Sequence, residues 1–494
     1  MRNLLTDPIW EEKDLGQPIP ESPHACSVAL PLWKHVIGYE EEDADILDRL
    51  QCGYPRFFCN RIVRKLFDRI EQERSLSNEK VLLFPSIKAA ERCADYVRNR
   101  HASSPRIEAL GHHRLSAVYL PNPAVATAMD YWRYSGEIVT SRQAEAALGH
   151  AAERAIEGDQ ARRTLRQRLA KLSGQNKEDV FLFPSGMSAV FAVHRAVQHI
   201  FPGWKSAQLE FPYVDVLRIQ KEFGAGVHFF PLAGTAESQR IGDVLEEEQL
   251  SAVFCELASN PLLRSADVDT LLPIALKNEI PLVVDDTISS NVNIDAFRVA
   301  DVVTSSLTKF FSGTSDVMAG SVILRHDSPF REPFASFLRE EINDGLWDDD
   351  AIVLEHHSRD YVQRMQTINS NGEILFDYLS SKTELEHVFY PKSETPEFYR
   401  QLQRPNSGYG GLLSFVFKEF RNAPPFYDRI HVTKGPSLGT NFTLACPYTL
   451  LAHYRELDWA ESCGCSRGLI RVSVGLEDPG DLIQRFEDAF LTLR

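Results

Sequence analysis

A single lysine stands among hydroxyl and glycine residues in the stretch TSSLTKFFSGTSDVMAGSVIL, residues 304–324. Lys309 follows a short run of β-branched residues, and Ser306 and Thr308 place two hydroxyl donors close to it. A lysine amine at the end of a strand can be a surface charge, a phosphate ligand or a covalent nucleophile. Taken alone, the segment favours a surface or ion-paired lysine, so other segments must decide which chemistry applies.

Two other segments change that interpretation. Gly186 and Met187, in PSGMS, begin a helical pattern whose first backbone N–H groups can hold an anion. Asp285 ends a very apolar run, where a carboxylate requires a cation. A lysine for a Schiff base, an aspartate for a ring nitrogen and a phosphate site are what pyridoxal 5′-phosphate (PLP) needs. Tyr213 offers an aromatic face for the ring, although an aromatic of the core or its rim is the simpler interpretation.

Apolar runs predict the strands that position these residues. The runs are VFLF (180–183), SAVFC (251–255), PLVVDD (281–286), DVVTSS (301–306) and SVIL (321–324), and helical patterns such as 187–200 separate them. This alternation predicts an α/β domain with a mostly parallel sheet. Polar clusters follow four of the runs, so we expect them to meet at the carboxyl edge of the sheet.

The chain is longer than one hydrophobic core usually supports, at 494 residues. We predict an N-terminal extension over 1–140, a large cofactor-binding domain over 141–325 and a small α+β domain over 326–494. The third unit rests on a helix-rich stretch followed by GYGGLLSFVF (408–417) and GLIRVSVGLED (468–478).

Composition excludes several classes of partner. The formal net charge of −16 argues against nucleic acids and anionic membranes, and no apolar run reaches spanning length. The eight cysteines have no framework spacing, and Cys463-Gly464-Cys465 lacks the second pair of a zinc site. We therefore expect a cytoplasmic protein with no metal and with small molecules as its ligands.

The polar clusters also resemble a known family. FPSGMSAV, ELASNPLLRSADV, VVDDTISS, DVVTSSLTKFFSGTSDVMAGSVIL, SLGTNFTL and GLIRVSVGLEDPGDLI stand in the order of the fold-type I PLP-dependent Cys/Met metabolism (trans-sulfuration) enzymes. The likeness is strongest to the fungal cystathionine γ-synthase branch, and residues 23–41 and GYPRFF (53–58) extend it toward the N-terminus. It implies amino-acid substrates and a homo-oligomer, a dimer or tetramer, with residues 1–140 taking part in subunit contacts.

The resemblance assigns a role to each matching position. Lys309 would be the Schiff-base lysine and the proton shuttle. Arg471, an unremarkable strand arginine without the family, would bind the substrate α-carboxylate with help from Ser437. The other cofactor contacts would be Asp285 at the pyridine nitrogen, Asn260 beside the 3′-hydroxyl, Tyr213 on the ring, and Gly186, Met187, Ser306 and Thr308 at the phosphate.

The implied reaction is a γ-replacement on an O-acyl-L-homoserine, with L-cysteine as nucleophile and L-cystathionine as product. A carbon nucleophile such as a β-keto acid of fungal secondary metabolism, or sulfide, is the alternative, and a γ- or β-lyase is a third. A catalytically inactive homologue is disfavoured because Lys309, Asp285 and Arg471 are all present.

Two segments depart from the family pattern. A tyrosine and an arginine in Tyr-x-Arg-x-Gly order should reach the phosphate from the neighbouring subunit, but WRYSGEIVTSR (132–142) has Trp132 and Tyr134 there. Arg133 or Arg142 would then supply the cation. Phe442 replaces a glutamate common in the family, which leaves the second substrate open. The role of the N-terminal extension is open too.

Overall fold

The computed structural model describes every residue except 1, 77, 112, 151–153, 342–344 and 494. Within these residues, a central sheet of seven strands has the order β6 (Val180–Phe183), β12 (Gly320–Leu324), β11 (Val302–Ser306), β10 (Leu282–Asp285), β9 (Leu250–Glu256), β7 (Lys205–Leu209) and β8 (Val227–Phe230). β12 is antiparallel to both of its neighbours, and the strands from β11 to β8 are parallel. The predicted α/β class and mostly parallel sheet are confirmed.

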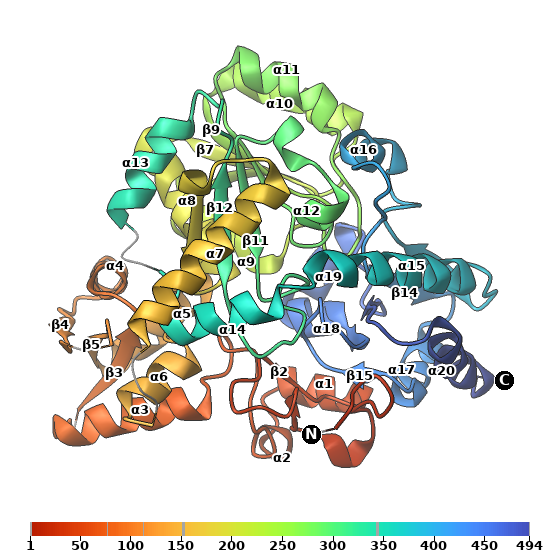
Figure 1. The fold of residues 1–494 in the computed structure, drawn as a ribbon, viewed down its shortest axis with the longest axis horizontal. Helices are drawn as coiled ribbons and strands as arrows, with labels where there is room; N and C mark the ends of the chain where they lie inside the picture. The colour runs from red at the N-terminus through yellow and green to blue at the C-terminus, as the bar shows by residue number, and fades with distance from the viewer. Residues whose placement is uncertain (1, 77, 112, 151–153, 342–344, 494) are drawn as a thin grey trace.

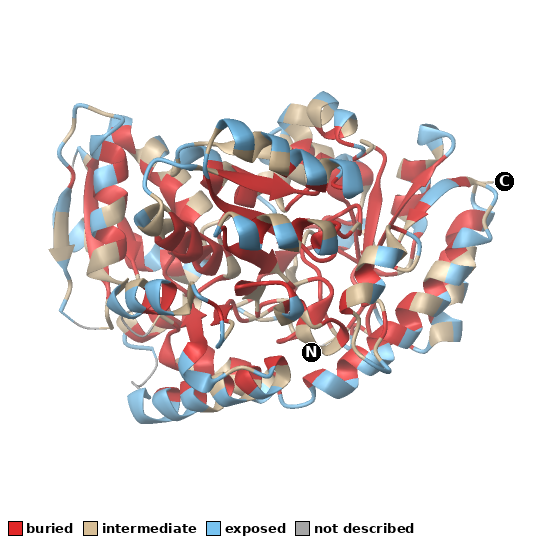
Figure 2. Cartoon of the chain, turned by 90° about the horizontal axis from the view of Figure 1, so that it is seen from above, coloured by how far each residue is buried: buried red, intermediate tan, exposed pale blue. Residues whose placement is uncertain are grey.

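Helices cover both faces of this sheet because successive strand residues face opposite layers. Val283 packs in the apolar cluster of α8 (Gly186–Ile200) and α13 (Arg331–Glu341). Val284 packs in the cluster of α10 (Thr235–Glu247) and α11 (Val268–Lys277). α7 (Ala155–Ser173) and α14 (Asp348–His357) share a further core with β6 and β12. Figure 2 shows the buried strands between helices whose outer sides are exposed.

A second unit follows the first sixty residues. β3 (Glu79–Phe84), β5 (Ser116–Pro121) and β4 (Arg106–Ala109) form a small antiparallel sheet in that spatial order. α3 (Arg61–Glu73), α4 (Ile87–Arg98), α5 (Val125–Ser135) and α6 (Ser141–Ala147) share one apolar core with it. This unit lies beside α7 and α8 in Figure 1, coloured orange to yellow.

The C-terminal part contains a third sheet. Its strands run in the order β13 (Leu385–Phe389), β14 (Leu412–Phe417), β17 (Ile470–Ser473), β16 (Leu444–Pro447) and β15 (Thr433–Lys434). α15 (Tyr361–Ser380), α17 (Ala423–Arg429) and α20 (Pro479–Leu491) pack on it. The remaining helices are α2 (Ala44–Leu47), α9 (Val214–Glu222), α12 (Ser290–Asn293), α16 (Pro396–Leu402), α18 (Tyr448–His453) and α19 (Leu457–Ser462).

The start of the chain packs on its end. β1 (Pro18–Ile19) pairs with β2 (Ser27–Val28), and α1 (Trp33–Glu40) follows them. Val28, Leu30 and Trp33 share the apolar core of the C-terminal sheet, and Figure 1 shows these red segments beside the blue β15 and α17. The stretch 1–140 therefore contributes to two separate cores. No described helix is long and apolar enough to cross a membrane.

Candidate active site

The carboxyl ends of neighbouring strands gather the candidate residues at one edge of the central sheet. Asp285 ends β10 and Ser306 ends β11, and Asp285 is in register with Glu256 at the end of β9. Gly186 begins α8 just after β6. The structure thus brings together segments that lie up to 120 residues apart in the chain (186 to 306).

Lys309 is buried just after β11. Its Nζ donates a hydrogen bond to Ser437 Oγ at 3.3 Å and lies 4.7 Å from the centre of the Tyr54 ring. Burial, and then the charges of Arg471 and Arg56, lower the pKa of Lys309 to about 7. A large share of this amine is therefore neutral near pH 7, as a nucleophile or base must be.

Asp285 is a buried carboxylate whose surroundings suit a cationic ligand. It accepts hydrogen bonds from Thr287 N at 2.9 Å and from Thr304 Oγ1 at 3.2 Å. Burial raises the pKa of Asp285, and among the described residues no cation faces it to reverse this effect. A protonated pyridine nitrogen is such a cation, so this position fits the expected PLP.

Arg471 reaches the same site from the C-terminal sheet. Its guanidinium donates to Asn260 Oδ1 at 3.1 Å and to the Pro436 and Ser437 carbonyls at 2.8 and 3.1 Å, and it lies over the Tyr448 ring. It is 3% exposed. Arg471 is predicted to bind the substrate α-carboxylate and Asn260 to contact the cofactor. The hydrogen bond between them therefore connects the two predicted subsites.

The N-terminus of α8 has the geometry of an anion site. The Ser185 side chain caps this helix by accepting from Ser188 N at 3.0 Å. Within the described residues, the N–H groups of Gly186 and Met187 have no acceptor, which leaves them for a phosphate. A Cβ at Gly186 would lie 2.7 Å from the Cβ of Ser306, so the approach of these two segments requires glycine.

Thr308, predicted as a phosphate ligand, is engaged elsewhere. Its hydroxyl accepts from Ala319 N at 3.1 Å and donates to Ala319 O at 3.3 Å, and the residue is 2% exposed. These bonds fix the turn between β11 and β12 that carries Lys309. A phosphate contact from Thr308 stays a prediction, and the structure gives its side chain this second role.

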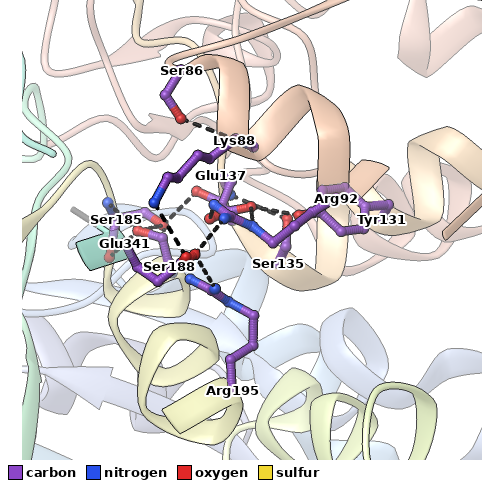
Figure 3. Close-up of polar contacts among 12 residues, drawn as sticks. Ser86, Lys88, Arg92, Tyr131, Ser135, Glu137, Ser185, Ser188, Arg195 and Glu341 are labelled. Carbon is purple, nitrogen blue, oxygen red and sulfur yellow. Dashed lines mark hydrogen bonds and ion pairs between the residues drawn. The ribbon is translucent and has the colours of Figure 1, made fainter. Parts of the chain in front are cut away.

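An ion-pair network stands behind the α8 N-terminus, as Figure 3 shows. Arg92 binds both Glu137 and Glu341, and Arg195 binds Glu341 at 2.6 Å. Burial raises the pKa of Glu137, but the charges of Arg92 and Arg195 outweigh burial and hold it below its usual value. The network joins α4, α5, α8 and α13, and thereby fixes the turn at Gly136, whose carbonyl accepts from Ser185 Oγ at 2.8 Å.

A Tyr-x-Arg pair that was not predicted lies at the site within the same chain. Tyr54-Pro55-Arg56 of GYPRFF lies at the site, with Tyr54 over Lys309 and Arg56 donating to Tyr213 Oη at 2.5 Å and Asp215 Oδ2 at 2.7 Å. Arg56 is 1% exposed. The signal was present in the sequence as the same Tyr-x-Arg spacing, one domain earlier than expected.

Within the chain, residues 132–142 have other contacts, and their role toward a neighbouring subunit stays a prediction. Trp132 is buried in the core of the small N-terminal sheet, packed edge-on against Phe67 and Phe84, because an indole fills an apolar interior. Tyr134 Oη accepts from Arg218 at 3.2 Å. The structure does not bring either arginine candidate to the α8 N-terminus: Arg133 is near Asp130, and Arg142 pairs with Asp350 and Asp316.

Glu256 is a site residue that sequence reasoning missed. One carboxylate oxygen accepts from Tyr213 N at 2.6 Å and the other from Asn260 N at 3.2 Å. Burial and the neighbouring Asp285 raise the pKa of Glu256 well above its usual value. Its signal was the one that identified Asp285, an acidic residue that ends an apolar run. Glu256 thereby sets the main-chain positions of two predicted cofactor contacts.

Comparisons with known proteins agree with this geometry. Residues 143–491 match the model of the Cys/Met metabolism PLP-dependent enzymes, and residues 62–140 match that of the fungal trans-sulfuration enzyme N-terminal domain. A cystathionine γ-synthase of Neurospora crassa is 33% identical over 96% of this chain and 98% of its own length. An L-2-amino-4-chloropent-4-enoate dechlorinase/desaturase of Streptantibioticus cattleyicolor is 32% identical over 96% and 97%.

A solved structure shares the fold. The putative O-acetylhomoserine (thiol)-lyase of Campylobacter jejuni, crystallised with a pyridoxyl-lysine phosphate, superposes with a TM-score of 0.59 and 22% identity. The match covers 67% of this chain and 86% of that one.

Proposed function

Because this chain belongs to the family of Cys/Met metabolism PLP-dependent enzymes, we propose that it catalyses a γ-replacement on an O-acyl-L-homoserine. L-cysteine is the proposed nucleophile and L-cystathionine the product. One observation carries the proposal: Ser437 connects the Lys309 amine to the Arg471 guanidinium, so a base and a carboxylate ligand lie at one point. The full-length relative from Neurospora supports the choice of substrates.

Arg471 fixes the amino-acid substrate by its α-carboxylate. Its hydrogen bonds to the carbonyls of Pro436 and Ser437 hold the guanidinium plane, so a bidentate contact requires little reordering. The Cα of the substrate then lies on the Lys309 side of the arginine. Tyr213 is held by Glu256 and Arg56, which suits a ring that must keep one orientation against the cofactor.

Lys309 moves the protons of the reaction. When bound, PLP withdraws electrons from the substrate Cα and makes its proton acidic. The neutral Lys309 amine takes this proton, and loss of a second proton from Cβ accompanies departure of the γ-acyloxy group as a carboxylic acid. The cysteine thiol gives up its proton as its sulfur forms a bond to Cγ, and protons return to Cβ and Cα. The products are L-cystathionine and the free acid.

A second candidate is the same γ-replacement with a carbon nucleophile or sulfide, and elimination without replacement is a third. Phe442 keeps these alternatives open, because it stands where the family resemblance implies a glutamate. Relatives with other activities match along nearly the whole chain as well, among them the dechlorinase/desaturase.

The test is incubation of the purified enzyme with O-acetyl-L-homoserine and one nucleophile at a time, with products read by mass spectrometry. L-cysteine, sulfide and a β-keto acid form the panel, and Lys309→Ala protein is the control. Cystathionine from cysteine alone is the expected result. An adduct with the β-keto acid and none with cysteine would refute cysteine as the nucleophile and support the carbon nucleophile of the second candidate.

A further inference from the structure

The loop of residues 435–443 forms one wall of the candidate site. Ser437 binds Lys309 Nζ through its hydroxyl and Arg471 through its carbonyl. Gly439 has φ +73°, and a Cβ there would lie 2.5 Å from Phe310 N, so this part of the loop rests directly on the backbone around Lys309. Asn441 N donates to Gly313 O at 2.7 Å. We call residues 435–443 the substrate loop.

The outer side of the substrate loop is covered by residues 4–31, here called the N-terminal strap. The backbones meet at Lys434, immediately before the loop: Lys434 N donates to Ile9 O at 3.0 Å, and Leu30 N donates to Lys434 O at 3.1 Å. Lys434 Nζ is buried and donates to Pro31 O at 3.0 Å. These bonds clamp the start of the loop between two parts of the strap.

The strap also packs tightly against the loop itself. A Cβ at Gly435 would lie 2.7 Å from Val28 O, so the strap and the loop approach as closely as a glycine permits. Phe442, 7% exposed, shares an apolar cluster with Leu444 and with four strap residues: Leu4, Ile9, Ile19 and Ala29. Phe442 therefore serves as the apolar anchor of the strap.

A further bond connects the strap to the lysine segment. Cys26 N donates to Ser315 O at 2.7 Å, six residues after Lys309. The strap thus contacts both segments that meet at the Lys309–Ser437 hydrogen bond. A segment that binds two facing walls of a site restricts the distance between them.

We propose that the N-terminal strap is a positioning element for the substrate end of the active site, with Phe442 as its anchor. Phe442 acts through packing on the loop that carries Ser437. The inference rests on the proposed function only in naming Arg471 and Ser437 as the amino-acid subsite. The apolar cluster around Phe442 contains none of the predicted cofactor contacts, so we expect the loss of this side chain to leave cofactor binding unchanged.

The experiment compares Phe442→Ala with Phe334→Ala in the full-length, PLP-loaded enzyme. Phe334 is a fully buried phenylalanine of α13, and its apolar cluster contains no described residue of the strap or the substrate loop, so its loss leaves a comparable cavity elsewhere. Phe442→Leu is the conservative variant. Two quantities are measured: KM for O-acetyl-L-homoserine, and hydrogen exchange of the backbone amides of residues 435–443.

In Phe442→Ala we expect KM to rise about tenfold, faster exchange across 435–443 and unchanged PLP affinity, because an anchoring contact is lost. Phe442→Leu should restore most of both quantities, and Phe334→Ala should change neither. Equal KM and equal loop exchange in Phe442→Ala and Phe334→Ala would overturn the inference. If wild-type enzyme performs no γ-replacement, the proposed function falls, and the exchange of residues 435–443 still decides the role of the strap.

Discussion

At the scale of single residues, the site shows how burial and neighbouring charges select one lysine for chemistry. Burial lowers the pKa of both Lys309 and Lys434 to about 7. Lys434 Nζ donates to the backbone carbonyls of Pro31 and Asp428, a structural role. Lys309 instead faces Ser437 and Tyr54 beside the buried Arg471. A lowered pKa therefore marks a candidate only together with the groups around it.

Uptake of PLP by cofactor-free enzyme should depend on pH through Lys309. Its pKa is about 7 in place of the ordinary 10.5, so the amine is charged and unreactive below pH 7 and neutral above it. The rate of covalent uptake, read by stopped-flow absorbance, should fall about tenfold per pH unit below pH 7 and level off above it. A rate that keeps rising toward pH 10 would show a lysine with an ordinary pKa.

Glu256→Gln should weaken PLP binding. The carboxyl oxygens accept from Tyr213 N and Asn260 N, and an amide nitrogen cannot accept, so one backbone N–H loses its partner. We expect a Kd about fivefold higher in a fluorescence titration, the cost of about 1 kcal/mol. Glu248→Gln, at a more exposed ion pair with Lys205, is the control. Equal Kd values in the two variants would contradict the role given to Glu256.

Some site residues could be predicted from the sequence because their type differs from that of their neighbours. Lys309, Asp285 and Gly186 are of this kind, and the structure gathers them at one edge of the central sheet. Glu256 gave the same signal and was passed over. Tyr54 and Arg56 were missed because they lie in a separate segment, and nothing local in GYPRFF reveals that Arg56 contacts Tyr213, 157 positions later along the chain.

At the scale of elements, the position of the α8 N-terminus depends on the end of α5 that packs against it. Gly136 ends α5 with φ +65°, and a Cβ there would lie 2.6 Å from Ser185 Oγ and 2.8 Å from the Met187 Cβ. The network of Arg92, Glu137 and Glu341 holds that end in place (Figure 3). The small N-terminal sheet unit thereby supports the predicted phosphate site.

Gly136→Ala should weaken binding of PLP and leave binding of pyridoxal, which lacks the phosphate, nearly unchanged. Gly174→Ala is the matched control: Gly174 also ends a helix in the left-handed region, at φ +70°, but a Cβ there meets nothing within 4 Å. Both variants carry the same backbone strain, and only Gly136→Ala displaces Ser185. We expect a PLP Kd at least about tenfold higher in Gly136→Ala alone. An equal loss for pyridoxal would contradict a phosphate-specific role.

Prediction of elements succeeded where burial is continuous and failed where polar residues are buried. The five predicted strands are present at nearly the expected bounds. β7 was missed because it reads KSAQL: Ser206 and Gln208 are buried and satisfied through Gln220, a pairing that only the fold supplies. β8 was missed because three of its four residues are only half-buried at the sheet edge.

At the scale of the whole molecule, the two ends of the chain build one side of the active site together. Ile9 N donates to Thr433 Oγ1 across 424 positions, and Arg485 donates to Leu5 O. Local patterns carry no information on such pairings, so the sequence alone did not predict that the extension packs beside the candidate site. Residues of 1–140 lie in two different apolar cores.

We expect this enzyme to assemble into at least a dimer, as its family resemblance implies. The measurement is sedimentation equilibrium of the PLP-loaded protein, and the expected mass is at least twice the 55.9 kDa of one chain. A mass of one chain in a catalytically active preparation would refute this expectation. It would also show that Tyr54 and Arg56 act at the active site of their own chain.

The measurement that tests the central claim most directly is the reaction of O-acetyl-L-homoserine with L-cysteine in D₂O. If Lys309 removes the Cα proton and a second proton leaves Cβ, the cystathionine formed must carry solvent deuterium at Cα and Cβ, visible by mass spectrometry and NMR. Lys309→Arg enzyme should form no labelled product. Cystathionine without deuterium would show direct displacement at Cγ and contradict the assigned chemistry, and so would the absence of cystathionine.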